Sequence, residues 1–298
     1  MVKKGIKFSK EDLFISIIIY TLVTMALFIV MYPLYFVLIA SFSDPFAVYS
    51  GSVLFYPVKF TLKGYQKIFE HAKIMLGYRN TILYTVFGTC FNLFLTIPAG
   101  YALSRKDFTG KKIIMGYFVV TMFFGGGLIP TFLVVRDLGL YNTPWVMIIM
   151  GGISIWNTII CRTFFSIRIP SELLDAASVD GCTNMRFFFK IVLPLSKAII
   201  GVMALYYSVG HWNEYMNALI YLKDSELYTL QLILRDILIR NTILAEDLLD
   251  IGTGQPPERL EDLIRFSSII IASLPMLIFY PFVQKYFDKG VLVGSLKG

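Results

Sequence analysis

The N-terminal part of the chain holds an apolar stretch that a soluble domain of this size would not need. No charged residue occurs from Leu13 to Ser43. The hydrocarbon core of a bilayer is about 30 Å thick, and a helix needs roughly 20 residues to cross it. A signal peptide has a shorter apolar region and a small-residue cleavage site, which this stretch lacks. The stretch therefore predicts a membrane-spanning helix.

Five further segments are apolar over a similar length. Hydrophobic residues make up 56% of the chain and charged residues only 16%, against about 25% charged in an average soluble protein. Backbone groups in lipid must be hydrogen-bonded within their own segment, so these spans should be helical. We expect an all-α integral membrane protein with six transmembrane helices, and the glycine triplet at 125–127 is expected to be a close-packing or hinge site. The six predicted spans are residues 13–42, 80–103, 112–135, 144–165, 194–222 and 264–287.

Basic residues on the connections predict the orientation of these spans. The N-terminal arm (1–12), the second and fourth connections and the C-terminal tail (288–298) all carry lysine or arginine and would share one side. By the positive-inside rule that side is cytoplasmic, so both termini are expected there. The first connection, about 44–79, is also basic although it would face outward, but longer translocated loops weigh less in this rule. The net charge of +7 is then an orientation signal, with little support for nucleic-acid binding.

The sequence offers no recognisable catalytic or metal-binding motif. There is no phosphate-binding loop, nucleophile elbow, zinc-protease helix or dinucleotide fingerprint. His71 and His211 are isolated from each other and are interpreted as structural. No catalytic residue, metal or cofactor is therefore predicted for this chain. The three cysteines do not suggest a metal site or a disulfide framework; they are Cys90, Cys161 and Cys182.

The polar segment between the fourth and fifth predicted spans is the most informative part of the chain. Residues 172–194 read ELLDAASVDGCTNMRFFFKIVLP. Ser171 is a predicted helix N-cap. Glu172 and Asp175 are expected in the first turn, where carboxylates interact favourably with the helix dipole. Gly181 is expected to end this helix and turn the chain into a second short helix. Small residues here would let another surface approach the backbone closely.

Seven residues of this segment resemble the coupling loop of permease subunits in ABC-type importers. They follow the spacing EAA-x3-G-x9-I-x-LP, with Asp175 where the family usually has glutamate. The chain as a whole is similar to the second permease of the maltose-transporter-like, carbohydrate group, and within it to permeases for oligosaccharides or polysaccharide fragments. The segments 211–219 and 284–298 also carry this resemblance. The seven positions are Asp175, Ala176, Ala177, Gly181, Ile191, Leu193 and Pro194.

The resemblance implies a type I ABC importer permease fold and a set of partners. Two ATPase subunits would bind ATP and Mg, a second homologous permease would complete the pathway, and an extracytoplasmic solute-binding protein would deliver the substrate. This chain would be a permease subunit without enzymatic activity, in the cytoplasmic membrane of a prokaryote. Its coupling loop, 166–193, would dock on the ATPase. The residues implied in this coupling are Glu172, Asp175, Ala176, Ala177, Asp180, Gly181, Ile191, Leu193 and Pro194.

Polar and aromatic residues in the fifth predicted span are candidates for the substrate pathway, because polar groups in a membrane are costly unless they line a cavity or pair. Asn213 and Asn217 are expected to share a helix face, with Glu214 beside it. Trp212 and Tyr215 offer aromatic surfaces for sugar rings. Interhelical hydrogen bonding between the two permease subunits is the competing explanation. The wider candidate set includes Asn80, Asn92, Asn157, Tyr206 and Tyr207.

The fifth connection, 223–263, is long for a membrane protein and would face outward. Glu246, Asp247 and Asp250 lie in a polar stretch that is expected to be helical. Related permeases use this loop to reach the solute-binding protein, so the resemblance implies the same contact here. A solvated loop without a partner is the alternative.

Other functional classes predict features that this sequence lacks or leaves open. An ion-gradient-driven transporter or channel would need charged groups buried in mid-span. The predicted spans are almost free of them, and Glu214 is the main exception. A membrane-embedded enzyme would need a catalytic constellation. An ABC importer for a solute other than sugar remains a possible reading of the same coupling loop.

Overall fold

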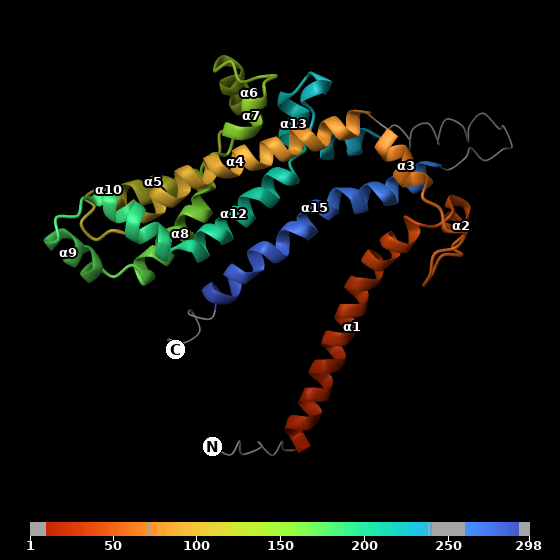
Figure 1. The fold of residues 1–298 in the computed structure, drawn as a ribbon, viewed down its shortest axis with the longest axis horizontal. Coiled ribbons are helices and arrows are strands. Elements are labelled where there is room, and N and C mark those ends of the chain that lie inside the picture. Colours follow the sequence, from red (N-terminus) through yellow and green to blue (C-terminus); the bar gives the residue numbers. More distant parts are fainter. Residues whose placement is uncertain (1–9, 71, 238, 240–259, 292–298) are drawn as a thin grey trace. The chain divides into compact units, whose positions relative to one another are not determined.

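The computed structural model describes residues 10–70, 72–237, 239 and 260–291, which form helices and turns without a strand (Figure 1). Their contacts divide the chain into two compact units. The described residues within Met1–Glu70 and Arg240–Ala272 form the first unit, and those within His71–Ile239 and Ser273–Gly298 form the second. The expectation of an all-α protein is confirmed over this part of the chain.

The first unit contains α1 (Lys10–Ala40), α2 (Pro45–Tyr49), α3 (Lys63–Glu70) and the N-terminal part of α15 (Leu260–Val291). A small core lies where α1 ends, formed by Ile39, Ala47 and Val53. The rings of Phe36 and Phe266 meet edge to face at 5.9 Å within this unit. Most of α1 lies outside this core, and its large apolar side chains are exposed on all sides of the helix. Such a surface suits lipid rather than water.

The second unit is built around α4 (Ala72–Ser104), which packs against α12, α8 and α7. Figure 1 shows α4 running beside α12, with α9 and α10 next to one end of α4. The other elements of this unit are α5 (Lys111–Phe123), α6 (Leu128–Asp137), α7 (Pro144–Ile149), α8 (Ile155–Arg168), α9 (Ser171–Val179), α10 (Asn184–Phe187), the π-helix η1 (Phe188–Val192), α11 (Leu193–Leu195), α12 (Lys197–Trp212), α13 (Met216–Tyr221) and the 3-10 helix η2 (Ser225–Leu227).

Small residues on the buried face of α4 allow its neighbours to approach closely. A Cβ atom at Gly100 would lie 2.6 Å from Cys161 Cβ of α8, and one at Gly88 would lie 2.5 Å from the His211 ring of α12. Lipid tails are as apolar as the helix surfaces, so the hydrophobic effect does not drive helices together in a membrane. They associate through close packing of this kind instead. Small and polar residues recur every three or four positions along this face: Gly77, Thr81, Thr85, Gly88, Thr89, Asn92, Thr96 and Gly100.

One hydrophobic core, which we call the coupling-end core, joins α4, α8 and α12 to the polar segment that follows α8. Phe165, Phe187 and Met203 are almost fully buried in it. A second core joins α4 to α6, α7 and α13. The buried members of the coupling-end core are Ile97, Tyr101, Cys161, Phe165, Phe187, Phe188, Val192, Ile199, Met203 and Tyr207.

Three helices in the described residues are long and apolar enough to cross a bilayer: residues 13–40 of α1, α4, and residues 264–281 of α15. Two bent pairs would each add one span, α5 with α6 at 114° and residues 184–195 with α12 at 79°. The structure therefore offers three to five candidate spans where the sequence predicts six. The fourth prediction, 144–165, is interrupted because α7 ends at Ile149 and α8 begins at Ile155.

The glycine triplet accounts for the bend between α5 and α6. α5 ends at Phe123, and Gly127 has a φ of 83°, a left-handed conformation that favours glycine. A Cβ atom at Gly125 or Gly127 would meet nothing within 4 Å. Of the two roles expected for the triplet, the structure therefore shows a bend rather than a close-packing site.

The fifth predicted span is also interrupted, between Trp212 and Met216. Asn213 Nδ2 donates to the carbonyl of Val209 at 2.9 Å, and Glu214 Oε1 accepts from the amide of Asn217 at 2.9 Å. The backbone amide of Asn213 also donates to the Val209 carbonyl, at 3.2 Å, so that carbonyl keeps its helical bond. Glu214 supplies the acceptor that a continuous helix would offer to the amide of Asn217. The expectation that Asn213 and Asn217 share a helix face is therefore wrong.

Candidate functional site

The predicted coupling segment forms a compact turn between two short helices. α9 ends at Val179, and Gly181 follows with a φ of 70°. The amide of Gly181 donates to Ser178 O at 3.0 Å, and the amide of Cys182 donates to Ala177 O at 2.9 Å. This pair of bonds is a Schellman motif, which satisfies the last carbonyls of a helix and places glycine in the left-handed position. The prediction that Gly181 ends one helix and precedes another is confirmed.

The two faces of α9 have different environments. Leu174 and Ala177 are partly buried against the coupling-end core, so they hold the helix on the bundle. Glu172 and Asp175 are exposed on the other side of the helix, as is Ala176. The outer face therefore presents two carboxylates around a small side chain.

An apolar side chain that the sequence did not single out extends this outer face. Val179 is 89% exposed at the end of α9, next to the exposed Asp180. Met185, in α10, is 66% exposed. Val179 lies four positions after Asp175 and three after Ala176, so it shares their helix face. Nothing in the residue spacing marked Val179, because the matched pattern leaves that position free.

Several residues after Gly181 anchor the segment to the helix bundle. Phe187 and Phe188 are buried in the coupling-end core, while Ile191 and Leu193 pack against it. The π-helix η1 adds a residue to this turn, and such turns are frequent at functional sites. Pro194 is exposed within α11, just before the 79° bend into α12.

The start of α9 differs from the prediction by one position. The N-cap is Pro170, the helix begins at Ser171, and no side chain caps it. Only Glu172 lies in the first turn, because Asp175 follows in the next one. The hydroxyl of Ser171 instead accepts a long hydrogen bond from Lys106 Nζ, at 3.4 Å, which reaches over from the connection after α4.

A cavity of about 200 Å³ lies in the second unit, where two of the predicted spans are interrupted. The chain is not helical at Gly151 on one side and at Glu214 on the other. In a membrane, non-helical backbone is tolerated only where protein buries it or where it lines a water-filled space. The lining residues are Asn92, Val146, Met147, Met150, Gly151, Tyr206, Tyr207, Gly210, His211, Glu214 and Asn217.

A hydrogen-bond network holds the polar wall of this cavity in place. Asn92 Nδ2 donates to the carbonyls of Gly151 and Gly152 at 3.0 and 2.9 Å, and Asn92 Oδ1 lies 2.7 Å from His211 Nε2. Asn92 thereby ties α4 to the non-helical backbone after α7 and to α12. Glu214 Oε2 accepts from Asn217 Nδ2 at 3.0 Å. The cavity lining therefore offers a carboxylate, two amides and an imidazole.

The structure brings only part of the predicted pathway set together. Glu214 and Asn217 line the cavity, whereas Trp212 is buried with its ring 6.2 Å from that of Tyr78. Asn213 and Tyr215 are exposed outside the lining. The sequence predicts His211 to be structural, but the structure places it in the cavity lining. Its position there depends on the contact with Gly88 of α4, which no local pattern predicts.

Some predicted residues lie outside the described part of the chain. Glu246, Asp247 and Asp250, the expected contacts with a solute-binding protein, are among them, as are residues 1–9 and 292–298. Within the described residues, no group of three or more His, Cys, Asp or Glu side chains could hold a metal ion.

Comparison with known proteins identifies the family to which the chain belongs. Residues 72–293 match the family described as binding-protein-dependent transport system inner membrane component. The chain belongs to this family. The matched region contains the coupling segment and all of the cavity lining.

Individual relatives are similar over nearly their whole length. The polygalacturonan/rhamnogalacturonan transport system permease protein YtcP of Bacillus subtilis (strain 168) is 40% identical over 97% of this chain and 100% of its own. The arabinooligosaccharides transport system permease protein AraQ of Halalkalibacterium halodurans is 26% identical, over 91% of this chain and 92% of its own.

A solved structure shares the architecture as well. It is the crystal structure of a bacterial ABC transporter involved in the import of the acidic polysaccharide alginate. One of its chains superposes with a TM-score of 0.85 at 29% identity, covering 95% of this chain and 100% of that chain. The fold is therefore that of a type I ABC importer permease, as the resemblance implied.

Proposed function

We propose that this chain is a permease subunit of an ATP-driven importer for carbohydrate, in particular for oligosaccharides. The observation that supports it most is the coupling segment. A short helix is held on the bundle by Leu174 and Ala177 and presents Glu172, Asp175 and Val179 outward. The relatives named for polygalacturonan, arabinooligosaccharide and alginate transport support the class of cargo.

In this proposal the energy comes from other subunits. Two ATPases would hydrolyse Mg-ATP, one of them engaging the outer face of α9, and a second permease with its own coupling loop would complete the pathway. A solute-binding protein would deliver substrate and contact the loop that holds Glu246, Asp247 and Asp250. Closure of the ATPases would rock two rigid helix bundles between discrete arrangements, as in other alternating-access machines. This chain would have no enzymatic activity of its own.

The proposal also covers topology and cargo path. Six spans within residues 13–287 would place residues 1–12, the coupling loop 166–193 and the tail 288–298 in the cytoplasm of a prokaryote, with 223–263 outside. The fourth span would then combine α7 and α8, with its interruption at the cavity. Glu214 and Asn217 would contact the sugar there, because carboxylate and amide groups suit hydroxyls. Trp212, Asn213 and Tyr215 would act indirectly, by shaping the interruption of the fifth span between α12 and α13.

A substitution at Gly181, which has a left-handed backbone conformation, tests whether this turn docks on an ATPase. Gly181→Ala adds a side chain where φ is 70° but where nothing lies within 4 Å, so its cost is backbone strain of about 1–3 kcal/mol. We expect less ATPase to co-purify with the variant from detergent-solubilised membranes. Gly139→Ala is the matched control, since Gly139 follows α6 with a φ of 69° and equal space. Equal ATPase recovery from both variants would contradict the docking role of this turn.

The driving force and cargo need a transport measurement. The purified chain with its ATPase, second permease and binding protein would be placed in lipid vesicles and offered labelled oligogalacturonides or arabino-oligosaccharides. We expect uptake only when ATP is supplied on the side of the membrane that carries the ATPases and the binding protein is present on the other side. Uptake driven by a proton or sodium gradient without ATP would favour the secondary-transporter alternative.

A further inference from the structure

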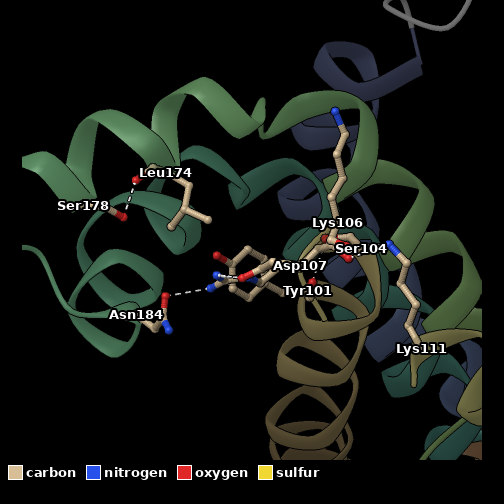
Figure 2. Close-up of polar contacts among 9 residues, drawn as sticks. Tyr101, Ser104, Lys106, Asp107, Lys111, Leu174, Ser178 and Asn184 are labelled. Atoms are coloured by element: carbon tan, nitrogen blue, oxygen red, sulfur yellow. Dashed lines mark hydrogen bonds and ion pairs between the residues drawn. The ribbon is translucent and has the colours of Figure 1, made fainter. Parts of the chain in front are cut away.

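One arginine joins the coupling segment to the helix that carries the cavity wall. Arg105 follows α4 directly, and its side chain is only 16% exposed. Nη1 donates to Asn184 Oδ1 at the start of α10, at 2.8 Å. Nε donates to Asp107 Oδ1 at 2.8 Å, and Nη2 bonds the other oxygen of the same carboxylate. Figure 2 shows Asn184 and Asp107 close together at this end of α4, with Tyr101 beside them.

These bonds hold the guanidinium in one orientation. Fork-to-fork pairing of arginine with a carboxylate is strong and directional, and the hydrogen bond from Arg105 lowers the pKa of the Asp107 carboxyl. A lowered pKa means that the ion pair is complete at neutral pH and is lost only in acid, below the usual range of a carboxyl group. Asp107 therefore orients the guanidinium through Nε and Nη2, and Nη1 is left to donate to Asn184 Oδ1.

The same arginine rests on an aromatic cluster that connects three elements. The guanidinium carbon lies 6.0 Å from the centre of the Tyr101 ring of α4, within the range of a cation–π contact. The Tyr101 ring in turn lies 5.7 Å from Phe165 of α8 and 5.2 Å from Phe188 of η1. Polar and aromatic contacts thus join the end of α4 to the coupling segment at two points.

From Tyr101 the contacts continue to the cavity. Tyr207 belongs to the same coupling-end core and lines the cavity. Its hydroxyl lies 2.6 Å from Thr96 Oγ1 of α4 and accepts from the amide of Ser154 at 3.2 Å. Asn92 lies on α4 itself, which stays helical through Pro98 up to Ser104. Asn92 and Tyr101 are nine positions apart, which corresponds to about 14 Å of helix.

We propose that Arg105 is a positioning residue that transmits movement of the coupling segment to α4 and thereby to Asn92 in the cavity wall. This inference rests on the proposed function, because an ATPase must move the segment. Asn184 lies between the Gly181 turn and η1, so a shift of α9 and α10 acts directly on the guanidinium. Lysine could not replace arginine, since a single ammonium lacks the planar fork that reaches both partners.

The test uses the assembled transporter and a reporter on α4. Cys90 is exposed on that helix, two positions from Asn92, and Cys161 is buried. A bimane fluorophore is attached to Cys90 in a chain carrying Cys182→Ser, and its ATP-plus-vanadate response is recorded in lipid vesicles. We expect Asn184→Ala, which leaves the Arg105–Asp107 pair intact, to reduce the response about fivefold. Arg105→Lys should do the same, while the ATPase stays bound in both variants.

Two further variants separate this role from a structural one. Asn184→Asp keeps an oxygen acceptor for Arg105 and should restore the response. Thr163→Ala removes a hydroxyl that bonds only within α8, to Ile159 O at 2.9 Å, and should leave the response unchanged. An Asn184→Ala response equal to that of Thr163→Ala, or no response in the starting protein with its ATPase bound, would overturn the inference. Absence of any bound ATPase would instead refute the proposed function.

Discussion

At the residue scale, the cavity depends on a glycine that no sequence pattern singles out. Gly88 of α4 faces the His211 ring so closely that an added Cβ atom would lie 2.5 Å from Cε1 and Nε2. The ring is thereby placed where Nε2 meets Asn92 Oδ1 at 2.7 Å. An amide and an imidazole 119 residues apart in sequence meet because α4 and α12 lie in close contact.

This contact yields a prediction for Gly88→Ala. The added methyl group must push the imidazole aside, which breaks its bond to Asn92 and overpacks the interface by about 1–3 kcal/mol. We expect a lower apparent melting temperature of the purified complex and impaired transport. Gly116→Ala is the matched control, because Gly116 also lies within a helix but its Cβ would meet nothing within 4 Å. Equal melting temperatures for both variants would show that the His211 ring moves without cost.

Residue spacing predicted the coupling segment better than it predicted the cavity. The Gly181 turn follows from a local rule, since glycine adopts a left-handed conformation at low cost. Glu214 and Asn217 were selected because polar groups in spans are uncommon, and the structure places both in the cavity lining. Trp212 was selected for its chemistry, but which way an aromatic ring faces depends on where the helix ends.

At the element scale, the structure offers three to five candidate spans where the sequence predicts six, and several predicted spans are not single helices. Hydropathy averages over about 20 residues, so it registers a span and not an interruption of three to five residues inside it. At the break after Trp212, the Glu214 side chain accepts from the backbone amide of Asn217, which has lost its helical partner. The break between α7 and α8 is bonded by Asn92 from another helix. Asn213 and Glu214 are a local signal for the break after Trp212. The break between α7 and α8 has no such signal, because its bonds come from α4.

The packing of α4 on α8 gives a prediction at this scale. In Gly100→Ala the new Cβ atom would lie 2.6 Å from Cys161 Cβ and 3.2 Å from the backbone nitrogen of Arg162. Neither atom can rotate away, so the two helices must separate. We expect a loss of stability of about 3 kcal/mol, at the upper end of the range for overpacking. The measurement is the midpoint of chemical unfolding of the purified complex.

A second substitution checks the cause. Cys161→Gly removes the opposing Cβ atom, so the double variant Gly100→Ala with Cys161→Gly should recover part of the lost stability. Cys161→Ala retains that atom and should recover none. Recovery by both substitutions would show that the sulfur, and not helix separation, accounts for the loss.

At the scale of the whole molecule, the distribution of basic residues predicts which side each connection occupies. The coupling segment and Lys223 would lie on opposite sides of the membrane in a six-span topology. Both regions belong to the second structural unit, and both contain exposed side chains.

This topology predicts opposite labelling of two engineered cysteines. In a chain without its three native cysteines, Ser178→Cys on α9 should react with a membrane-impermeant maleimide only in inside-out vesicles. Lys223→Cys should react only in right-side-out vesicles, because that loop would face outward. Labelling of both positions from the same side would contradict the six-span arrangement, and the control is the cysteine-free chain, which should not react.

The sequence by itself determined that this protein is helical and membrane-embedded, and which segment resembles a coupling loop. Each of these follows from local information: apolar length, charge on connections and the spacing of a short motif. Only the tertiary structure decided that Leu174 and Ala177 face the core while Val179 faces outward, and that Arg105 bonds Asn184. It also decided which polar residues meet at the cavity. The physical reason is that close packing and side-chain bonding to a distant backbone depend on which helices become neighbours.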